Sequence, residues 1–135
     1  MQTFLPVPDF KASAKILDFK RLGKQRVEAF QILNILENKT QKKGWRNHPA
    51  TKMWKGYVPA LRQYLREMIL EWIDREFENN MQIPEDQGDF EYPKWFGNDE
   101  LHASHRSNLL RKFPEFYGLL GWKETNNLPY YWPVK

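Results

Sequence analysis

The chain has 135 residues, a formal net charge of +4 and no cysteine. Its length predicts one domain, spanning residues 1–135, that can bury a core without cross-links. The absence of cysteine excludes a disulfide framework, a Cys-ligated zinc site and a thiol nucleophile. The charge is uneven, because residues 10–62 carry a net +10 and residues 63–100 a net −8. A basic half attracts polyanions, so charge and aromatic content favour a nucleic-acid partner over a merely solvated basic surface.

The N-terminal segment, Met1 to Pro6, has neither a basic region nor a long apolar run, so it does not resemble a signal peptide. No apolar stretch of the chain approaches the ~18 residues that a membrane span needs. We therefore expect a cytoplasmic protein without membrane contact, and we expect it to be a monomer.

Two helices are predicted in the first third of the chain. Asp9 is suited to cap a short helix that runs to about Asp18, after an extended segment that contains Pro6 and Pro8. Apolar residues at helical spacing then predict a first long helix at residues 20–38. Gly23 weakens the first turn, so regular helix is expected to begin near it.

A basic loop at residues 39–47 separates these helices from the next pair. Pro49 is suited to the first position of a short helix, with Asn47 or His48 near its cap and Gly56 at its end. Residues 58–78 carry a broad apolar stripe and are predicted to form the longest helix.

The remaining chain is predicted to contain a long loop and two more helices. Residues 79–98 have no periodicity, which predicts a surface loop with Trp95 and Phe96 turned inward. A helix at residues 99–112 and a short one opened by Pro114 follow, and the aromatic tail at residues 128–133 is expected to pack back. No strand pattern is convincing. The predicted fold is therefore all-α, a compact single-domain bundle of about three main helices plus short helices.

Basic and aromatic side chains alternate through the first half of the chain, a pattern suited to holding phosphates and stacking on unpaired bases. They are Lys20, Arg21, Lys24, Arg26, Lys42, Lys43, Trp45, Arg46, Lys52, Trp54, Lys55 and Tyr57. Glu28 is the only acid between Asp18 and Glu37. A carboxylate among such cations stays ionised and repels DNA, so its presence in a DNA-binding region requires an explanation. Proton transfer or stabilisation of a cationic sugar intermediate is one, and an i,i+4 ion pair with Lys24 is the alternative.

A metal site is not expected from the histidines. His102 and His105 are three residues apart and could face one ion, with Glu100 or His48 added. Three histidines without cysteine are a poor set of ligands, and such pairs more often face solvent or a phosphate. There is also no Gly-rich phosphate loop and no nucleophile elbow. We therefore predict neither a metal nor a cofactor.

Several blocks of the sequence resemble a known family. Arg26-Val27-Glu28-Ala29 and Gly44-Trp45-Arg46-Asn47-His48-Pro49 resemble the pyrimidine-dimer DNA glycosylase superfamily, of the phage endonuclease V type, and its bacterial relatives. Three further blocks look like one bacterial branch of that superfamily. These are Met1 to Pro6, Leu22 to Arg26 and His102 to Asn108.

The resemblance implies a compact all-α enzyme that bends DNA, extrudes a base, removes it and can then cleave the strand as an AP lyase. In such enzymes the N-terminal α-amine attacks C1′ of the sugar, and a helix carboxylate assists elimination of the 3′ phosphate. Glu28 is the match to that carboxylate. The phage enzyme uses a threonine amine after losing its initiator Met. Because Gln2 has a long side chain that disfavours Met removal, the expected nucleophile here is the Met1 amine, and the alternative is an enzyme without the lyase step.

The resemblance and the charge pattern together predict a site on lesion-bearing double-stranded DNA. Its predicted catalytic residues are Met1 and Glu28. Its predicted DNA-binding residues are Lys24, Arg26, Lys43, Trp45, Arg46, Asn47, His48, Lys52, His102, His105 and Arg106. Two alternatives stay open: a nucleic-acid-binding module without catalysis, and a helical domain that binds proteins or small ligands.

Overall fold

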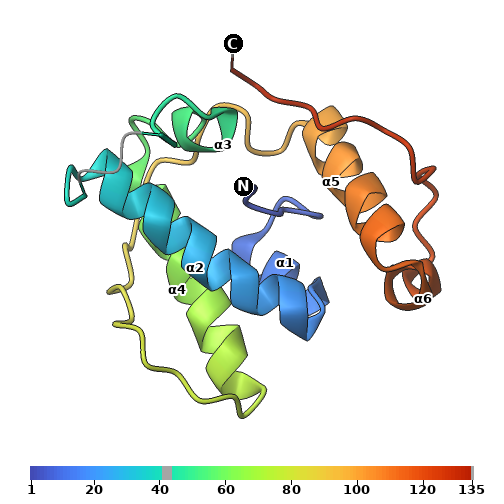
Figure 1. The fold of residues 1–135 in the computed structure, drawn as a ribbon, viewed down its shortest axis with the longest axis horizontal. Helices are drawn as coiled ribbons and strands as arrows, with labels where there is room; N and C mark the ends of the chain where they lie inside the picture. The colour runs from blue at the N-terminus through green and yellow to red at the C-terminus, as the bar shows by residue number, and fades with distance from the viewer. Residues whose placement is uncertain (41–43, 135) are drawn as a thin grey trace.

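The computed structural model describes residues 1–40 and 44–134, and these form an all-helical protein (Figure 1). The helices are α1 (Phe10–Ile16), α2 (Phe19–Leu36), α3 (Pro49–Lys52), α4 (Val58–Asp74), α5 (Asp99–Lys112) and α6 (Pro114–Tyr117), followed by a 3-10 turn at Gly118–Leu120. The described residues contain no strand. The predicted all-α class is confirmed. None of these helices is both long and apolar enough to cross a membrane.

The helix ends show how the local sequence positions the elements. The Asp9 side chain accepts a hydrogen bond from the Ala12 N–H at 2.8 Å, as predicted for the cap of α1. His48 caps α3 with Pro49 at its first position, so one of the two predicted caps is confirmed. The helix at Asp99–Lys112 has the predicted bounds, and the Asn98 side chain caps it by accepting from the Leu101 N–H.

Helices α2 and α4 pack along each other and form the centre of the core. Two predictions about them were wrong. Residues 58–78 were predicted to form the longest helix. Helix α4 instead ends at Asp74, and its 17 residues are one fewer than the 18 of α2. Gly23 does not mark the start of regular helix, since α2 already begins at Phe19. A Cβ at Gly23 would lie 3.0 Å from the Trp72 ring, so glycine here permits close contact between the two helices.

The N-terminal segment runs through the interior of the molecule, between α2 and α5 (Figure 1). Residues 2–5 are buried on both sides. The long segment before α5 has no helix, as predicted, and Trp95 turns inward and donates its indole N–H to the Met53 carbonyl at 2.7 Å. The aromatic tail does pack back, because the Tyr131 N–H donates to the Ser104 hydroxyl of α5 at 3.2 Å. Tail, α5 and N-terminus thus form one packed layer beside α2.

Candidate active site

The Glu28 carboxylate lies on the side of α2 that faces the N-terminal segment. It accepts hydrogen bonds from the backbone N–H of Gln2 at 3.2 Å and from the Gln25 amide at 3.3 Å. It also lies 3.8 Å from the Lys24 ammonium group, so the i,i+4 ion pair considered from the sequence is present. The Glu28 side chain is 12% exposed and that of Lys24 is 71% exposed. An ion pair so open to water contributes little stability, so it does not by itself explain the carboxylate.

The N-terminal segment is held in place by polar side chains from several helices. The Phe4 N–H donates to the Gln25 side-chain oxygen at 2.8 Å, and the Phe4 carbonyl accepts from the Tyr64 hydroxyl at 2.8 Å. The Thr3 hydroxyl accepts from the indole N–H of Trp54 at 3.0 Å. Buried hydrogen bonds of this kind are costly to leave unmade, so they fix the path of the backbone up to Gln2. The residue after Met1 is therefore held against Glu28.

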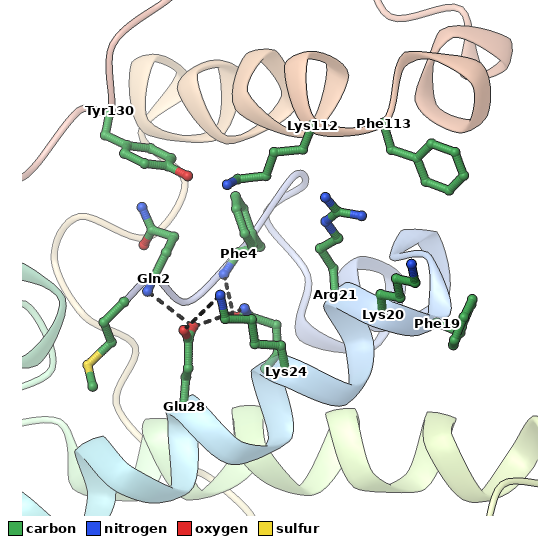
Figure 2. A pocket seen from close by; sticks show the side chains of 12 residues that line it. Gln2, Phe4, Phe19, Lys20, Arg21, Lys24, Glu28, Lys112, Phe113 and Tyr130 are labelled. Carbon is green, nitrogen blue, oxygen red and sulfur yellow. Dashed lines mark hydrogen bonds and ion pairs between the residues drawn. The ribbon is translucent and has the colours of Figure 1, made fainter.

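Met1 and Glu28 open into one cavity of about 740 Å³ (Figure 2). The cavity is lined by Met1, Gln2 and Phe4 of the N-terminal segment, Phe19, Lys20, Arg21, Lys24, Gln25 and Glu28 of α2, Lys112 and Phe113 at the end of α5, and Tyr130 of the tail. Glu28 is the only carboxylate among these lining residues, which include four cationic side chains. The volume falls within the range of pockets that hold a small organic ligand, such as a nucleotide.

The His48 ring is electrostatically linked to the same site. Burial and the positive charge of the N-terminal amine lower the pKa of His48, and the Glu28 carboxylate opposes this shift. Its Nδ1 accepts a hydrogen bond from the Ala50 N–H at 3.0 Å, so the neutral ring carries its proton on Nε2. The ring centroid lies 5.3 Å from that of Trp45 and 5.7 Å from that of Trp132. His48 is thus a neutral, aromatic-packed group close to the predicted nucleophile.

Lys112 is a second amine in the cavity. Burial, followed by the neighbouring charges of Arg21 and Lys24, lowers the pKa of Lys112. Figure 2 shows its ammonium group extending from the end of α5 toward the N-terminal segment. Lys112 is exposed, but a lysine with a lowered pKa is a more available nucleophile than one with an ordinary pKa.

Arg26 lies on the opposite side of α2 and does not line the cavity. Its guanidinium carbon lies 3.9 Å from the centre of the Trp72 ring, and one of its nitrogens lies 3.6 Å from the Met81 sulfur. The predicted DNA contact at this residue therefore has no support from its position, because Arg26 packs against α4. The helical geometry explains the difference, since residues 26 and 28 project about 200° apart.

The three basic residues predicted on α5 hold the N-terminal segment instead of facing solvent. His105 Nδ1 accepts from the Leu5 N–H at 2.9 Å, and His102 Nδ1 lies 2.8 Å from the Leu5 carbonyl. Both rings are buried, which removes them from direct contact with DNA. Arg106 donates to the Pro6 carbonyl at 2.8 Å and pairs with Glu124 of the tail. The prediction treated this side of α5 as a surface, whereas it is an interior contact.

The loop before α3 brings most of its predicted residues to the surface. Trp45 is 45% exposed, and Arg46 donates to the Asn38 side chain at 3.2 Å. Arg46, Asn47 and Lys52 line a second hollow, separate from the main cavity. Lys43, also predicted to bind DNA, lies outside the residues that the structure describes.

Several cavity residues were missed in the sequence. Lys112 and Phe113 end α5, and Tyr130 belongs to the tail, so more than 80 residues separate each of them from Glu28. A basic residue in the last turn of a helix is ordinarily explained by the helix dipole, which hides any other role. Gln2 was considered only for its effect on Met1 removal. Lys20 and Arg21 were counted among the basic residues but not assigned to the site.

A family model described as pyrimidine dimer DNA glycosylase matches residues 1–85. The chain belongs to this family. The matched region contains both Met1 and Glu28, the loop before α3 and all of α4, whereas α5 and the tail lie beyond it. No curated protein and no solved structure matches the chain. Membership assigns the protein to the DNA-repair glycosylases, whose substrate is DNA.

Proposed function

We propose that this protein breaks the glycosidic bond of one nucleotide of a pyrimidine dimer in double-stranded DNA and then acts as an AP lyase, with the Met1 amine as nucleophile and Glu28 as the catalytic carboxylate. The observation that carries the proposal is the hydrogen bond from the Gln2 N–H to Glu28. It holds the residue after Met1 against the carboxylate at the wall of a basic cavity. An α-amine suits the role because its usual pKa leaves part of it neutral near pH 7.

The chemistry starts at C1′ of the damaged nucleotide. The neutral amine adds to C1′, the bond from C1′ to the base nitrogen breaks, and the base nitrogen keeps the electron pair and takes up a proton, while the base stays joined to its partner in the dimer. Loss of the amine proton and opening of the sugar ring leave an imine between the Met1 nitrogen and C1′. Glu28 then accepts a proton from C2′, and the electrons of that bond expel the 3′ phosphate from C3′. Water finally hydrolyses the imine.

The other lining residues bind and orient the DNA. Lys20, Arg21 and Lys24 line the wall that α2 contributes, where their charges suit the phosphates on either side of the lesion. Phe113 and Tyr130 present rings on the opposite wall, against which an extruded base or nucleotide can stack. Neither step needs a metal or a cofactor, and one copy of the chain provides all of these groups.

Borohydride trapping tests the proposal, because it reduces an imine to a stable amine and leaves protein attached to DNA. The protein should be trapped on a duplex with an abasic site and on one with a cyclobutane pyrimidine dimer. Glu28→Gln should still be trapped but should cleave the strand far more slowly, since imine formation precedes the proton transfer. Glu37→Gln, at the end of α2, is the matched control and should cleave normally. Salt-sensitive binding with neither adduct nor cleavage would instead support the module without catalysis.

A further inference from the structure

A second hollow, of about 370 Å³, lies between the end of α2, the loop before α3, α3 itself and the start of α4. Its polar lining comes from Asn38, Arg46, Asn47, Thr51, Lys52 and Lys55. None of the described residues that line it is acidic. Three cationic side chains without a carboxylate give this hollow a positive potential and an affinity for anions.

Thr51 provides an independent indication that the hollow accepts a ligand. Its side chain is 1% exposed, and its hydroxyl oxygen has no hydrogen-bond partner among the described residues. A buried hydroxyl without a partner costs roughly 1–3 kcal/mol of stability. Thr51 lines the hollow, but its hydroxyl oxygen is closed to solvent, so a rotation of the side chain is needed before it can donate to an anionic oxygen there and remove that cost.

In a neighbouring hollow a carboxylate neutralises the positive charges. This hollow is also basic in part, with Lys39 and Arg62, but Glu37 lies between them and pairs with both. In the hollow beside α3, Arg46 is bound only partly, through one nitrogen to the Asn38 amide oxygen. A guanidinium has five N–H donors, so Arg46 retains donors for a phosphate.

We propose that the hollow beside α3 binds a phosphate group, supplied by the DNA strand engaged in the main cavity. The assignment of this source rests on the proposed function. Asn47 lines the hollow, while the next residue, His48, senses the charge of the N-terminal amine. A strand that continues from the main cavity past this loop would bring a phosphate to the hollow. The same phosphate chemistry also allows a free nucleotide or inorganic phosphate as the ligand.

The first experiment measures binding of inorganic phosphate and of a deoxynucleoside monophosphate alone, by NMR titration of the folded protein. The amide signals of Thr51, Lys52 and Lys55 should shift with a saturable dependence on concentration. Thr51→Val replaces the hydroxyl by a methyl group of similar shape. It should be at least as heat-stable as the wild type without phosphate, and it should lose most of the stabilisation that phosphate confers. Lys15→Ala, in a different hollow, should bind phosphate normally.

The second experiment measures the salt dependence of binding to duplex DNA. Removing one phosphate contact lowers the slope of log K against log salt concentration by about one. Lys55→Ala, an exposed change that leaves the core intact, should therefore lower the slope by about one. Lys15→Ala is the matched control, because Lys15 lies beside Glu71 and Asp74 in a different hollow, and its slope should not change.

The outcomes separate the two sources from each other and from the enzymatic proposal. A lower slope for Lys55→Ala supports a strand phosphate, with or without measurable binding of free phosphate. Saturable phosphate binding with an unchanged slope supports the phosphate site but assigns it to a free ligand. Neither phosphate binding nor a change in slope overturns the proposal. Because both experiments measure binding, a protein that never forms an imine would still give these readouts.

Discussion

On one side of α2, Lys24 and Glu28 face the basic cavity and the N-terminal segment. On its other side, Gly23 and Arg26 lie against the Trp72 ring of α4. The first side holds the N-terminal segment through hydrogen bonds to Gln25 and Glu28. The second is covered by close apolar packing. Two cations only two residues apart therefore lie in different surroundings, because Lys24 faces the cavity and Arg26 packs against α4.

The largest expected effect on the cavity side is that of Glu28→Gln on strand cleavage. General acid–base groups contribute about 10²–10⁴-fold to rates, so cleavage of a pre-formed abasic site should fall by that order. The amide oxygen can still accept the Gln2 N–H, so the free energy of unfolding should change little. Single-turnover cleavage and urea unfolding measure the two quantities. A rate within a few-fold of wild type would remove Glu28 from the chemistry.

Acidification should destabilise the side of α2 that faces the cavity before it destabilises the side that packs against α4. Burial lowers the pKa of His105 to about 3 from a usual value near 6.5. Between these values the unfolded chain binds the proton more readily, so stability is complete above about pH 6.5 and falls as the pH decreases toward 3. Protonation also ends acceptance of the Leu5 N–H by Nδ1.

Hydrogen exchange between pH 7 and pH 4.5 measures this effect residue by residue. The amide of Leu5 should lose protection first, while amides in the middle of α4 keep theirs. His105→Asn offers an acceptor that does not titrate, so its unfolding free energy should fall less over the same range, although it starts lower because ring packing with Phe4 is lost. Equal loss of protection on both sides of α2 would show that the two sides are equally sensitive to acid.

Lys24→Ala should affect DNA binding, whereas Arg26→Ala should affect stability. Loss of the partly buried cation–π contact with Trp72 should lower the stability of Arg26→Ala by about 1–2 kcal/mol, with little change in DNA affinity. Lys24 is exposed, so its replacement should change stability by less than about 0.5 kcal/mol and lower the salt slope of DNA binding by about one. Urea unfolding measures the stability of the two variants, and fluorescence anisotropy measures their DNA affinity. If Arg26→Ala weakened DNA binding and Lys24→Ala lowered stability, the roles given to the two residues would be reversed.

Gly23→Ala should lower stability less than Arg26→Ala does. The new methyl group would lie 3.0 Å from the Trp72 ring, which is also held by its hydrogen bond to the Glu78 carbonyl. Overpacking of this kind costs roughly 1–3 kcal/mol, and the better helix propensity of alanine returns up to ~1 kcal/mol. We expect a net loss near 1 kcal/mol with cleavage unchanged, as measured by urea unfolding and by the single-turnover assay. A more stable variant would mean that the contact with α4 is looser than the structure indicates.

The sequence predicted those parts of the protein that local patterns determine. Apolar spacing, Asp9 and Pro49 located the helices, and Glu28 stood out as one acid among many cations. The α5 layer was predicted less well. His102, His105 and Arg106 look like a basic surface, and only tertiary packing shows that each forms a hydrogen bond with Leu5 or Pro6. For the same reason Lys112 and Tyr130 could not be joined to Glu28, because such long-range contacts leave no periodic trace in a single sequence.

The most direct test of the account identifies the atom that is trapped on DNA. Borohydride-reduced adducts with abasic DNA can be digested and their modified peptide identified by mass spectrometry, for the native chain and for a version extended by two residues before Met1. The account predicts that the adduct lies on the Met1 amine and that the extended version gives almost none. An adduct on Lys112, or equal trapping of the extended version, would contradict the assignment of Met1 as the nucleophile.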